Sequence, residues 1–238
     1  METIKILNLY ACLGGNRYKW NEISENIHVT AVELDKSLCD LYSQRFPNDT
    51  VINEDAHEFL LKHFKEFDFI WTSPPCPTHS RAAYGSRLSE KEICKNFDVV
   101  YPDLKLYEEI LLLQYYFKGK FCVENVIPFY EPLIMPQIRG RHAYWTNFKL
   151  PSQLNERKDL LGLIGGSSKI YKGKKLTAFE QLCLLHEIDL TNYNGPQDKI
   201  KIARNLVDYE AGKTIFETFF NLHTNQTKQV GLFETLNF

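Results

Sequence analysis

Short apolar runs alternate with helical patterns along the first half of this chain, and this alternation constrains the fold more than any other feature. Five runs are typical of strands buried in a sheet: residues 4–10, 29–33, 50–53, 67–71 and 120–124. Helical patterns lie between them, at residues 15–27, 36–46 and 102–117. Strands separated by helices predict an α/β fold with a doubly wound, mostly parallel sheet of the Rossmann-like type.

Size and composition are those of an ordinary globular protein. The 238 residues are 44% hydrophobic and 24% charged, which predicts one large domain with a small insertion. No apolar run could span a bilayer, and the N-terminus does not have the layout of a signal peptide. The six cysteines and seven histidines show no C-x-x-C or H-x-x-x-H spacing. We therefore expect no disulfide framework, no metal site, no membrane partner and a reducing cytoplasm.

Charge is distributed unevenly along the chain. The net charge is −2, yet residues 139–204 contain twelve Lys or Arg and six Asp or Glu. Residues 1–138 contain fourteen and twenty, respectively. A basic segment of this kind indicates either a face that meets a polyanion or a solvated lysine-rich surface.

A cysteine in a proline-rich turn is the strongest candidate for chemistry. The turn Ser73-Pro74-Pro75-Cys76-Pro77 directly follows the fourth predicted strand. Open α/β sheets bind ligands at the carboxyl ends of their strands, and the flanking prolines restrict the backbone around the thiol. A single cysteine is more often a small core residue, but this position favours an aimed nucleophile.

Three features at the ends of the first three strands indicate a nucleotide-type cofactor. Gly14 and Gly15 would allow a ligand to approach the backbone closely. Glu33 is placed to bind ribose hydroxyls, and Asp55 could bind an adenine amino group. Either carboxylate could instead be a helix N-cap. The turn has no complete G-x-G-x-x-G pattern, so an adenosyl cofactor without a pyrophosphate fits best.

Taken in order, the motifs of this chain resemble those of the cytosine-C5 DNA methyltransferase family. The matching segments are residues 8–15 (N-L-Y-A-C-L-G-G), 73–80 (S-P-P-C-P-T-H-S), 123–126 (V-E-N-V), 137–141 (Q-I-R-G-R), 176–180 (L-T-A-F-E) and 203–207 (A-R-N-L-V). Cys12 and Asn8 stand where the family commonly has glycine and aspartate. The run 143–148 also resembles the animal de novo members that have short recognition regions.

The resemblance implies an S-adenosylmethionine cofactor and a covalent mechanism. Cys76 would add to C6 of a flipped-out cytosine, and Glu124 would contact N3 and the exocyclic amine. Arg141 would hold O2, with Arg139 nearby on the face of one strand. The cofactor-binding positions implied are Tyr10, Gly14, Gly15, Glu33, Leu34, Asp55, Pro75, Asn205 and Val207. In isolation, Glu124-Asn125 could be a strand end before a turn, and both arginines could be surface charges.

The resemblance also implies a double-stranded DNA partner. Residues 1–148 and 201–238 would form the catalytic domain, and residues 149–200 a short target-recognition segment. Expected DNA contacts are Ser80 and Arg81, in a loop over residues 78–92, and the basic residues Lys169, Lys172, Lys174 and Lys175. A target-recognition segment this short predicts a short target sequence, low specificity, or reliance on a protein partner or a second copy of the chain.

Two other functions remain open from the sequence. One branch of the family methylates cytosine in tRNA, and a catalytically inactive nucleic-acid-binding member would share the fold. The complete set of Cys76, Glu124 and Arg141 favours an active enzyme. We expect a cytoplasmic, nucleoid-associated protein of bacterial or phage type.

Overall fold

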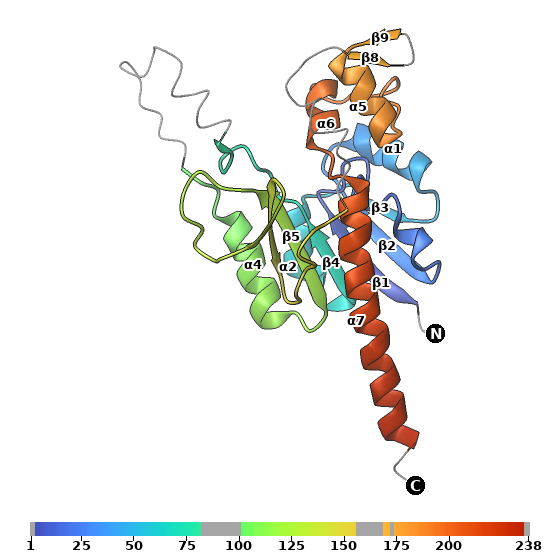
Figure 1. The fold of residues 1–238 in the computed structure, drawn as a ribbon, viewed down its shortest axis with the longest axis vertical. Helices are drawn as coiled ribbons and strands as arrows, with labels where there is room; N and C mark the ends of the chain where they lie inside the picture. Colours follow the sequence, from blue (N-terminus) through green and yellow to red (C-terminus); the bar gives the residue numbers. More distant parts are fainter. Residues whose placement is uncertain (1–2, 82–100, 156–168, 172–173, 236–238) are drawn as a thin grey trace.

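A seven-stranded sheet forms the centre of the molecule. The computed structural model describes residues 3–81, 101–155, 169–171 and 174–235, with the backbone alone in 169–171, 174–175 and 224–235. The strand order is β3-β2-β1-β4-β5-β7-β6 (Figure 1). Five strands are parallel: β1 (Ile4–Leu9), β2 (Ile27–Val32), β3 (Thr50–Ile52), β4 (Phe69–Thr72) and β5 (Lys120–Val126). An antiparallel hairpin of β6 (Gln137–Arg139) and β7 (His142–Thr146) completes the sheet. The predicted α/β class and mostly parallel sheet are confirmed.

Helices connect the parallel strands. Two of them, α1 (Lys36–Arg45) and α4 (Lys105–Tyr116), lie where helices were predicted. Within the described residues, α2 (Ala56–His63) connects β3 to β4, whereas α5 (Ala178–His186), α6 (Lys199–Asn205) and α7 (Tyr209–Thr235) come after β7 in the sequence. Short 3₁₀ turns occur at η1 (Trp20–Glu22) and η2 (Phe64–Glu66), and β8 (Lys169–Tyr171) pairs with β9 (Lys174–Leu176).

The helix predicted over residues 15–27 was wrong. This segment contains turns and only the single 3₁₀ turn η1. Two of its polar residues are buried and bind groups elsewhere in the chain: Asn16 donates to the Asn8 side chain, and Arg17 binds Asp49. Trp20 lies fully buried against α7 and donates to the Gly212 carbonyl. These contacts place consecutive side chains in directions that a regular helix could not provide.

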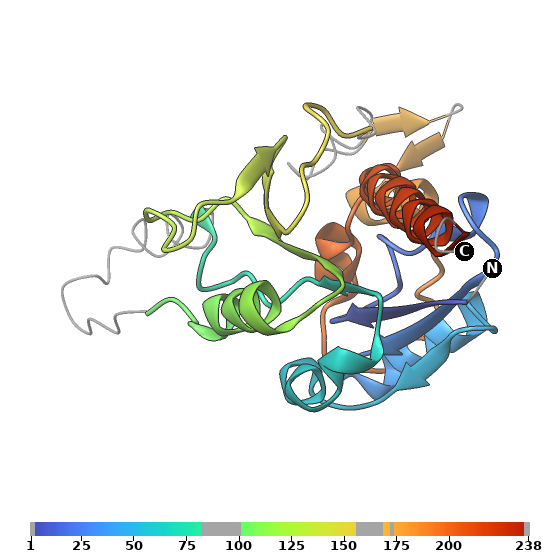
Figure 2. The ribbon, with the colours of Figure 1, turned by 90° about the horizontal axis from the view of Figure 1, so that it is seen from below.

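Two helical layers cover the sheet (Figure 2). On one face, α2 and α4 pack on alternate strand residues, including Leu7, Ile70 and Val123. On the other face, Trp20 and α7 pack on the residues between them, including Phe69 and Trp71. Burial on both faces explains why these strands have continuous apolar sequences.

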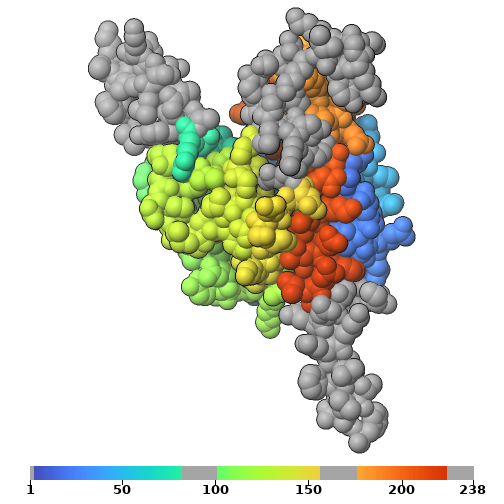
Figure 3. All heavy atoms as spheres, in the orientation of Figure 1, coloured from blue at the N-terminus to red at the C-terminus, as the bar shows by residue number. Residues whose placement is uncertain are grey.

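The C-terminal helix packs against residues from distant parts of the sequence. On the face shown in Figure 3, α7 lies beside the segment that follows β7. Phe148 and Leu150 from that segment share a cluster with Phe216 and Phe219 of α7. The same cluster contains Ile4 and Ile6 of β1, so residues from both ends of the chain build one core. The carboxyl ends of the parallel strands β1, β4 and β5 lie at one edge of the sheet. Within the described residues, no helix combines the length and the apolar character that crossing a membrane requires.

Candidate active site

The proline-rich turn carries Cys76 away from the end of β4. Two backbone N–H groups, from His79 and Ser80, donate to the Cys76 carbonyl at 3.0 Å each. The Asn125 side chain of β5 donates to the Pro74 carbonyl at 3.0 Å. The thiol-bearing residue is half-buried rather than packed in the core. Hydrogen bonds from within the turn and from the neighbouring strand thus hold a partly accessible cysteine.

Cys76, Glu124 and Arg141 line one cavity of about 210 Å³. Glu124 is 7% exposed on β5, the strand adjacent to β4. Arg141 is exposed at the mouth, in the turn between β6 and β7. His142 lines the same cavity, and its Nε2 lies 3.8 Å from Glu124 Oε1. The sequence motifs did not identify this residue. The structure therefore gathers a thiol, a carboxyl group and a guanidinium around one space.

The two arginines of the Q-x-R-x-R motif do not share a strand, so that expectation was wrong. Gly140, with φ of 54°, and Arg141 form the turn between β6 and β7. Arg139 ends β6, and its guanidinium donates to the carbonyls of Ile138, Leu150 and Pro151 at 2.7, 3.2 and 2.5 Å. Its place is outside the cavity, where it binds the backbone that follows β7.

Burial raises the pKa of the Cys76 thiol, and the nearby Glu124 raises it further, whereas Lys201 lowers it. The free protein therefore holds a thiol at neutral pH. Because the thiolate is the reactive form, we expect iodoacetamide to modify Cys76 slowly at pH 7. The rate should rise about tenfold per pH unit until the pH passes the raised pKa. Mass spectrometry of the Cys76 peptide would measure the rate of alkylation at each pH. The prediction would be contradicted if the rate levelled off at the pKa of an ordinary thiol, as it should in urea-unfolded protein.

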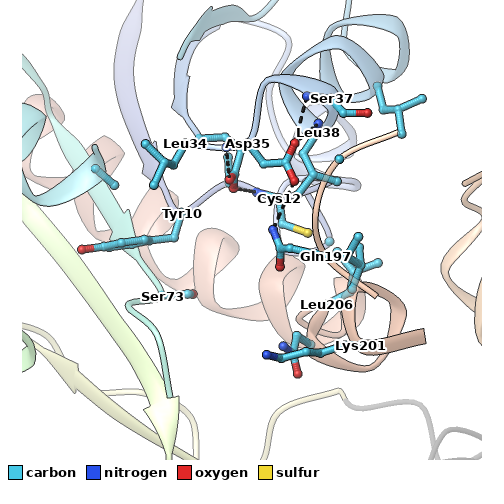
Figure 4. A pocket seen from close by; sticks show the side chains of 18 of the residues that line it. Tyr10, Cys12, Leu34, Asp35, Ser37, Leu38, Ser73, Gln197, Lys201 and Leu206 are labelled. Carbon is cyan, nitrogen blue, oxygen red and sulfur yellow. Dashed lines mark hydrogen bonds between the residues drawn. The ribbon is translucent and has the colours of Figure 1, made fainter. Parts of the chain in front are cut away.

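A larger cavity of about 1050 Å³ adjoins the first (Figure 4). Pro75, Cys76, Asn205 and Val207 line both. Eight of the nine positions predicted to bind the cofactor line the larger cavity: Tyr10, Gly15, Glu33, Leu34, Asp55, Pro75, Asn205 and Val207. The thiol thus borders a space large enough for a cofactor of nucleoside size.

Glu33 keeps free acceptor capacity inside this cavity. Its carboxylate accepts the backbone N–H groups of Cys12 and Asp35, at 2.9 Å each. Burial raises its pKa, while these two hydrogen bonds lower it. A carboxylate has about four acceptor sites, so Glu33 can still accept from a ligand hydroxyl. Cys12 has a left-handed φ of 47°, at the position where the family commonly has glycine.

The two glycines of the cofactor turn are needed for packing. Gly14 has φ of 65°, and a Cβ there would lie 2.4 Å from the Phe46 ring of the segment after α1. A Cβ on Gly15 would lie 2.5 Å from the Val207 carbonyl oxygen. Gly15 lines the cavity, whereas Gly14 faces the Phe46 and Tyr42 rings.

Asp55 is both a helix cap and a residue of the cavity wall. Its side chain accepts the Glu58 N–H at 3.0 Å and so caps α2, and it also lines the larger cavity. The N-cap interpretation and the ligand interpretation are therefore compatible at this position.

The motifs missed a loop that forms one wall of the larger cavity. Asn192, Asn194, Gly195, Pro196 and Gln197 line it. Tyr193 donates its hydroxyl to Asp35 at 2.6 Å, and Ser37 accepts the Asn194 N–H at 3.0 Å. Figure 4 shows Gln197 and Lys201 across the cavity from Tyr10 and Leu34. The loop has no recognisable motif, so only its contact with α1 reveals its place.

The residues expected to contact DNA are only partly described. Ser80 is half-buried and bridges to Pro128, and the exposed Arg81 donates to the Pro128 carbonyl at 3.2 Å. Lys169, Lys174 and Lys175 lie on the β8–β9 hairpin, where only the backbone is described. Lys172 and residues 82–92 of the expected loop lie outside the described residues. Among the residues whose positions are given, no group of three His, Cys, Asp or Glu could hold a metal ion.

Comparison with solved structures shows which fold this chain shares. The Entamoeba histolytica methyltransferase EhMeth superposes with a TM-score of 0.52 at 12% identity, covering 93% of this chain and 99% of the other. A candidate DNA modification methyltransferase encoded within an Escherichia coli prophage gives 0.55 at 10%, covering 93% and 99%. At such identities the likeness concerns the fold, which is the Rossmann-like methyltransferase fold.

A family model matches part of the sequence. The model of the C-5 cytosine-specific DNA methylases matches residues 4–95. This match spans the cofactor turn and the nucleophile motif, and it confirms the predicted resemblance to the cytosine-C5 DNA methyltransferase family. Glu124, Arg141 and Asn205 lie beyond the matched stretch. No curated protein matches the chain.

Proposed function

We propose that this protein is a DNA (cytosine-5-)-methyltransferase that uses S-adenosylmethionine. The observation that carries the proposal is the position of Cys76 between two adjoining cavities. One is lined by Glu124 and Arg141, and the other by eight of the nine predicted cofactor residues. A nucleophile at this boundary can attack a base in the smaller cavity while a methyl donor occupies the larger one.

The residues of the larger cavity fit the proposed cofactor. The spare acceptors of Glu33 would bind the ribose hydroxyls, and Asp55 the adenine amino group. Leu34, 69% exposed at the cavity wall, offers an apolar surface to the adenine ring. When bound, the cofactor supplies an electrophilic methyl group. Asn205 and Val207 would close its methionine end.

The chain's own residues would prepare the cytosine. The Cys76 thiol would first lose its proton to solvent, and addition of the resulting thiolate to C6 would form an S–C bond and make C5 nucleophilic. Protonated Glu124 would donate to N3, while Arg141 binds the O2 that gains negative charge. After methylation, loss of the C5 proton and departure of the Cys76 sulfur restore the aromatic ring. The target base must first be flipped out of the duplex.

Residues 149–200 would form the target-recognition segment, attached to the catalytic domain formed by 1–148 and 201–238. Its described part contains the β8–β9 hairpin and α5. Leu182 of α5 shares a cluster with Leu13 of the cofactor turn and Ile202 of α6. The DNA-reading hairpin would thus be anchored beside the catalytic cavities.

Transfer of a labelled methyl group would show whether DNA or tRNA is the substrate. Purified protein incubated with tritiated S-adenosylmethionine should label the C5 position of cytosine in double-stranded DNA. Label in tRNA alone would assign the protein to the tRNA branch. Cofactor binding without transfer to either would indicate an inactive nucleic-acid-binding member. Bisulfite sequencing of DNA from expressing cells would then give the target, which we expect to be short.

The two motif arginines should respond differently to substitution. Arg141→Ala removes a guanidinium from the catalytic cavity, so we expect kcat/KM to fall about a hundredfold with little change in stability. Arg139→Ala removes three bonds to backbone carbonyls, so we expect the free energy of unfolding to fall by about 2 kcal/mol. Steady-state kinetics and urea unfolding of both variants would measure this. If both variants remained folded and lost kcat/KM equally, the distinction between a catalytic Arg141 and a structural Arg139 would be wrong.

A further inference from the structure

A fully buried carboxylate links the two walls of the proposed active site. Glu109 of α4 is 0% exposed. Its Oε1 accepts the Tyr10 hydroxyl at 2.6 Å and lies 3.1 Å from His57 Nδ1. Its Oε2 accepts the Thr72 hydroxyl at 2.7 Å. We propose that Glu109 is a positioning residue, which holds Tyr10 at the cofactor cavity and Thr72 beneath the nucleophile turn; this inference rests on the proposed function.

Tyr10 needs such support because its backbone is strained. It follows β1 with a left-handed φ of 53°, which is uncommon for an aromatic residue and costs on the order of 1 kcal/mol. Its ring lines the cofactor cavity near Leu34, and Figure 4 shows its hydroxyl at the end away from Cys12. The bond to Glu109 therefore fixes the ring from outside the cavity and opposes relaxation of the backbone.

Thr72 is the corresponding contact on the nucleophile side. It is the last residue of β4 and is fully buried, and it pairs with Leu9 of β1 in the sheet. The turn that carries Cys76 begins at the next residue. One carboxylate thus binds at the ends of two adjacent strands, one of which leads into the cofactor turn and the other into the nucleophile turn.

The charge of Glu109 suits three simultaneous bonds. A buried carboxylate is stable only when its oxygens are paired, and here both are. The bond to Glu109 raises the pKa of His57, which favours an imidazolium beside the carboxylate. His57 Nε2 also lies 3.4 Å from the more exposed carboxylate of Glu108. A glutamine of the same shape has one acceptor oxygen, so it cannot accept from Tyr10 and Thr72 in the present geometry.

Substitutions at both ends of the bond test the proposal. We expect Glu109→Gln and Tyr10→Phe each to weaken S-adenosylmethionine binding about fivefold to tenfold by isothermal titration calorimetry. The double variant should be no weaker than either single variant, because both remove the same bond. Thr72→Val should instead lower the rate of covalent trapping by 5-fluorocytosine DNA more than it changes cofactor affinity.

Glu108→Gln is the matched control. It neutralises the neighbouring carboxylate, which also faces His57 but does not reach Tyr10 or Thr72, so cofactor affinity should change less than twofold. If Glu109→Gln fails to fold, Tyr10→Phe still removes one hydroxyl alone. Unchanged affinity in folded Glu109→Gln and Tyr10→Phe would overturn the inference, as would additive losses in the double variant. Absence of cofactor binding by the wild-type protein would instead overturn the proposed function.

Discussion

Replacing Cys76 with alanine is expected to abolish methyl transfer, with a loss of at least about 10⁴-fold in kcat. The proposed route passes through a bond between this sulfur and C6, and removing a covalent nucleophile typically has an effect of this size or larger. Wild-type protein should also form a complex with 5-fluorocytosine DNA that survives denaturation, because the fluorine at C5 cannot leave as a proton does. Cys76→Ala should form none. Denaturing gel electrophoresis would measure the complex.

Cys183→Ala provides the control for this experiment. Cys183 is a half-buried thiol on α5 that lies outside both catalytic cavities, and it should retain activity and trapping. If Cys76→Ala retained the complex while Cys183→Ala lost it, the assignment of the nucleophile would be wrong. If wild-type protein methylated ordinary DNA but formed no covalent complex with 5-fluorocytosine DNA, the covalent route itself would be wrong.

The largest expected effect on stability comes from Asp49. Its carboxylate accepts two bonds from Arg17, at 2.9 and 3.0 Å, and the side chains are only 3% and 5% exposed. Tyr42 donates to the same carboxylate at 2.9 Å. Asp49→Asn leaves the guanidinium buried without its counter-charge, so we expect the free energy of unfolding to fall by about 3–5 kcal/mol. Urea denaturation would measure the change.

Asp40→Asn is the matched comparison for Asp49→Asn. Asp40 pairs with Lys36 one helical turn away, and both side chains are more than half exposed. Water solvates both charges, so the substitution should change stability by less than about 0.5 kcal/mol. Similar losses in the two variants would mean that burial does not determine the strength of the Arg17–Asp49 pair.

The strands could be predicted because their environment is uniform. A parallel strand covered on both faces needs apolar side chains at nearly every position, and runs such as Phe69–Thr72 show this directly. The segment after Gly15 could not be predicted in the same way. Asn16, Arg17 and Trp20 find partners far away in the sequence, and these nonlocal contacts override local helical preference.

The site was predictable in its chemistry and unpredictable in part of its geometry. Cys76 follows β4 and Glu124 lies near the end of the adjacent strand β5, so the topology places them at one edge of the sheet. Arg139 and Arg141 are two residues apart, yet the Gly140 turn places only Arg141 at the cavity that Glu124 lines. Glu109 resembles an ordinary surface glutamate on a helix, and only the packing of α4 shows that it is buried.

The amino-acid sequence by itself determined the α/β class, the positions of the parallel strands and the residue types that meet at their carboxyl ends. These properties depend on local hydrophobicity and on spacing along the chain. Tertiary structure alone decided which side chains share a cavity, as when Tyr193 reaches Asp35 across 158 residues of sequence. Contacts over such separations depend on how the layers pack, and no local pattern encodes that packing.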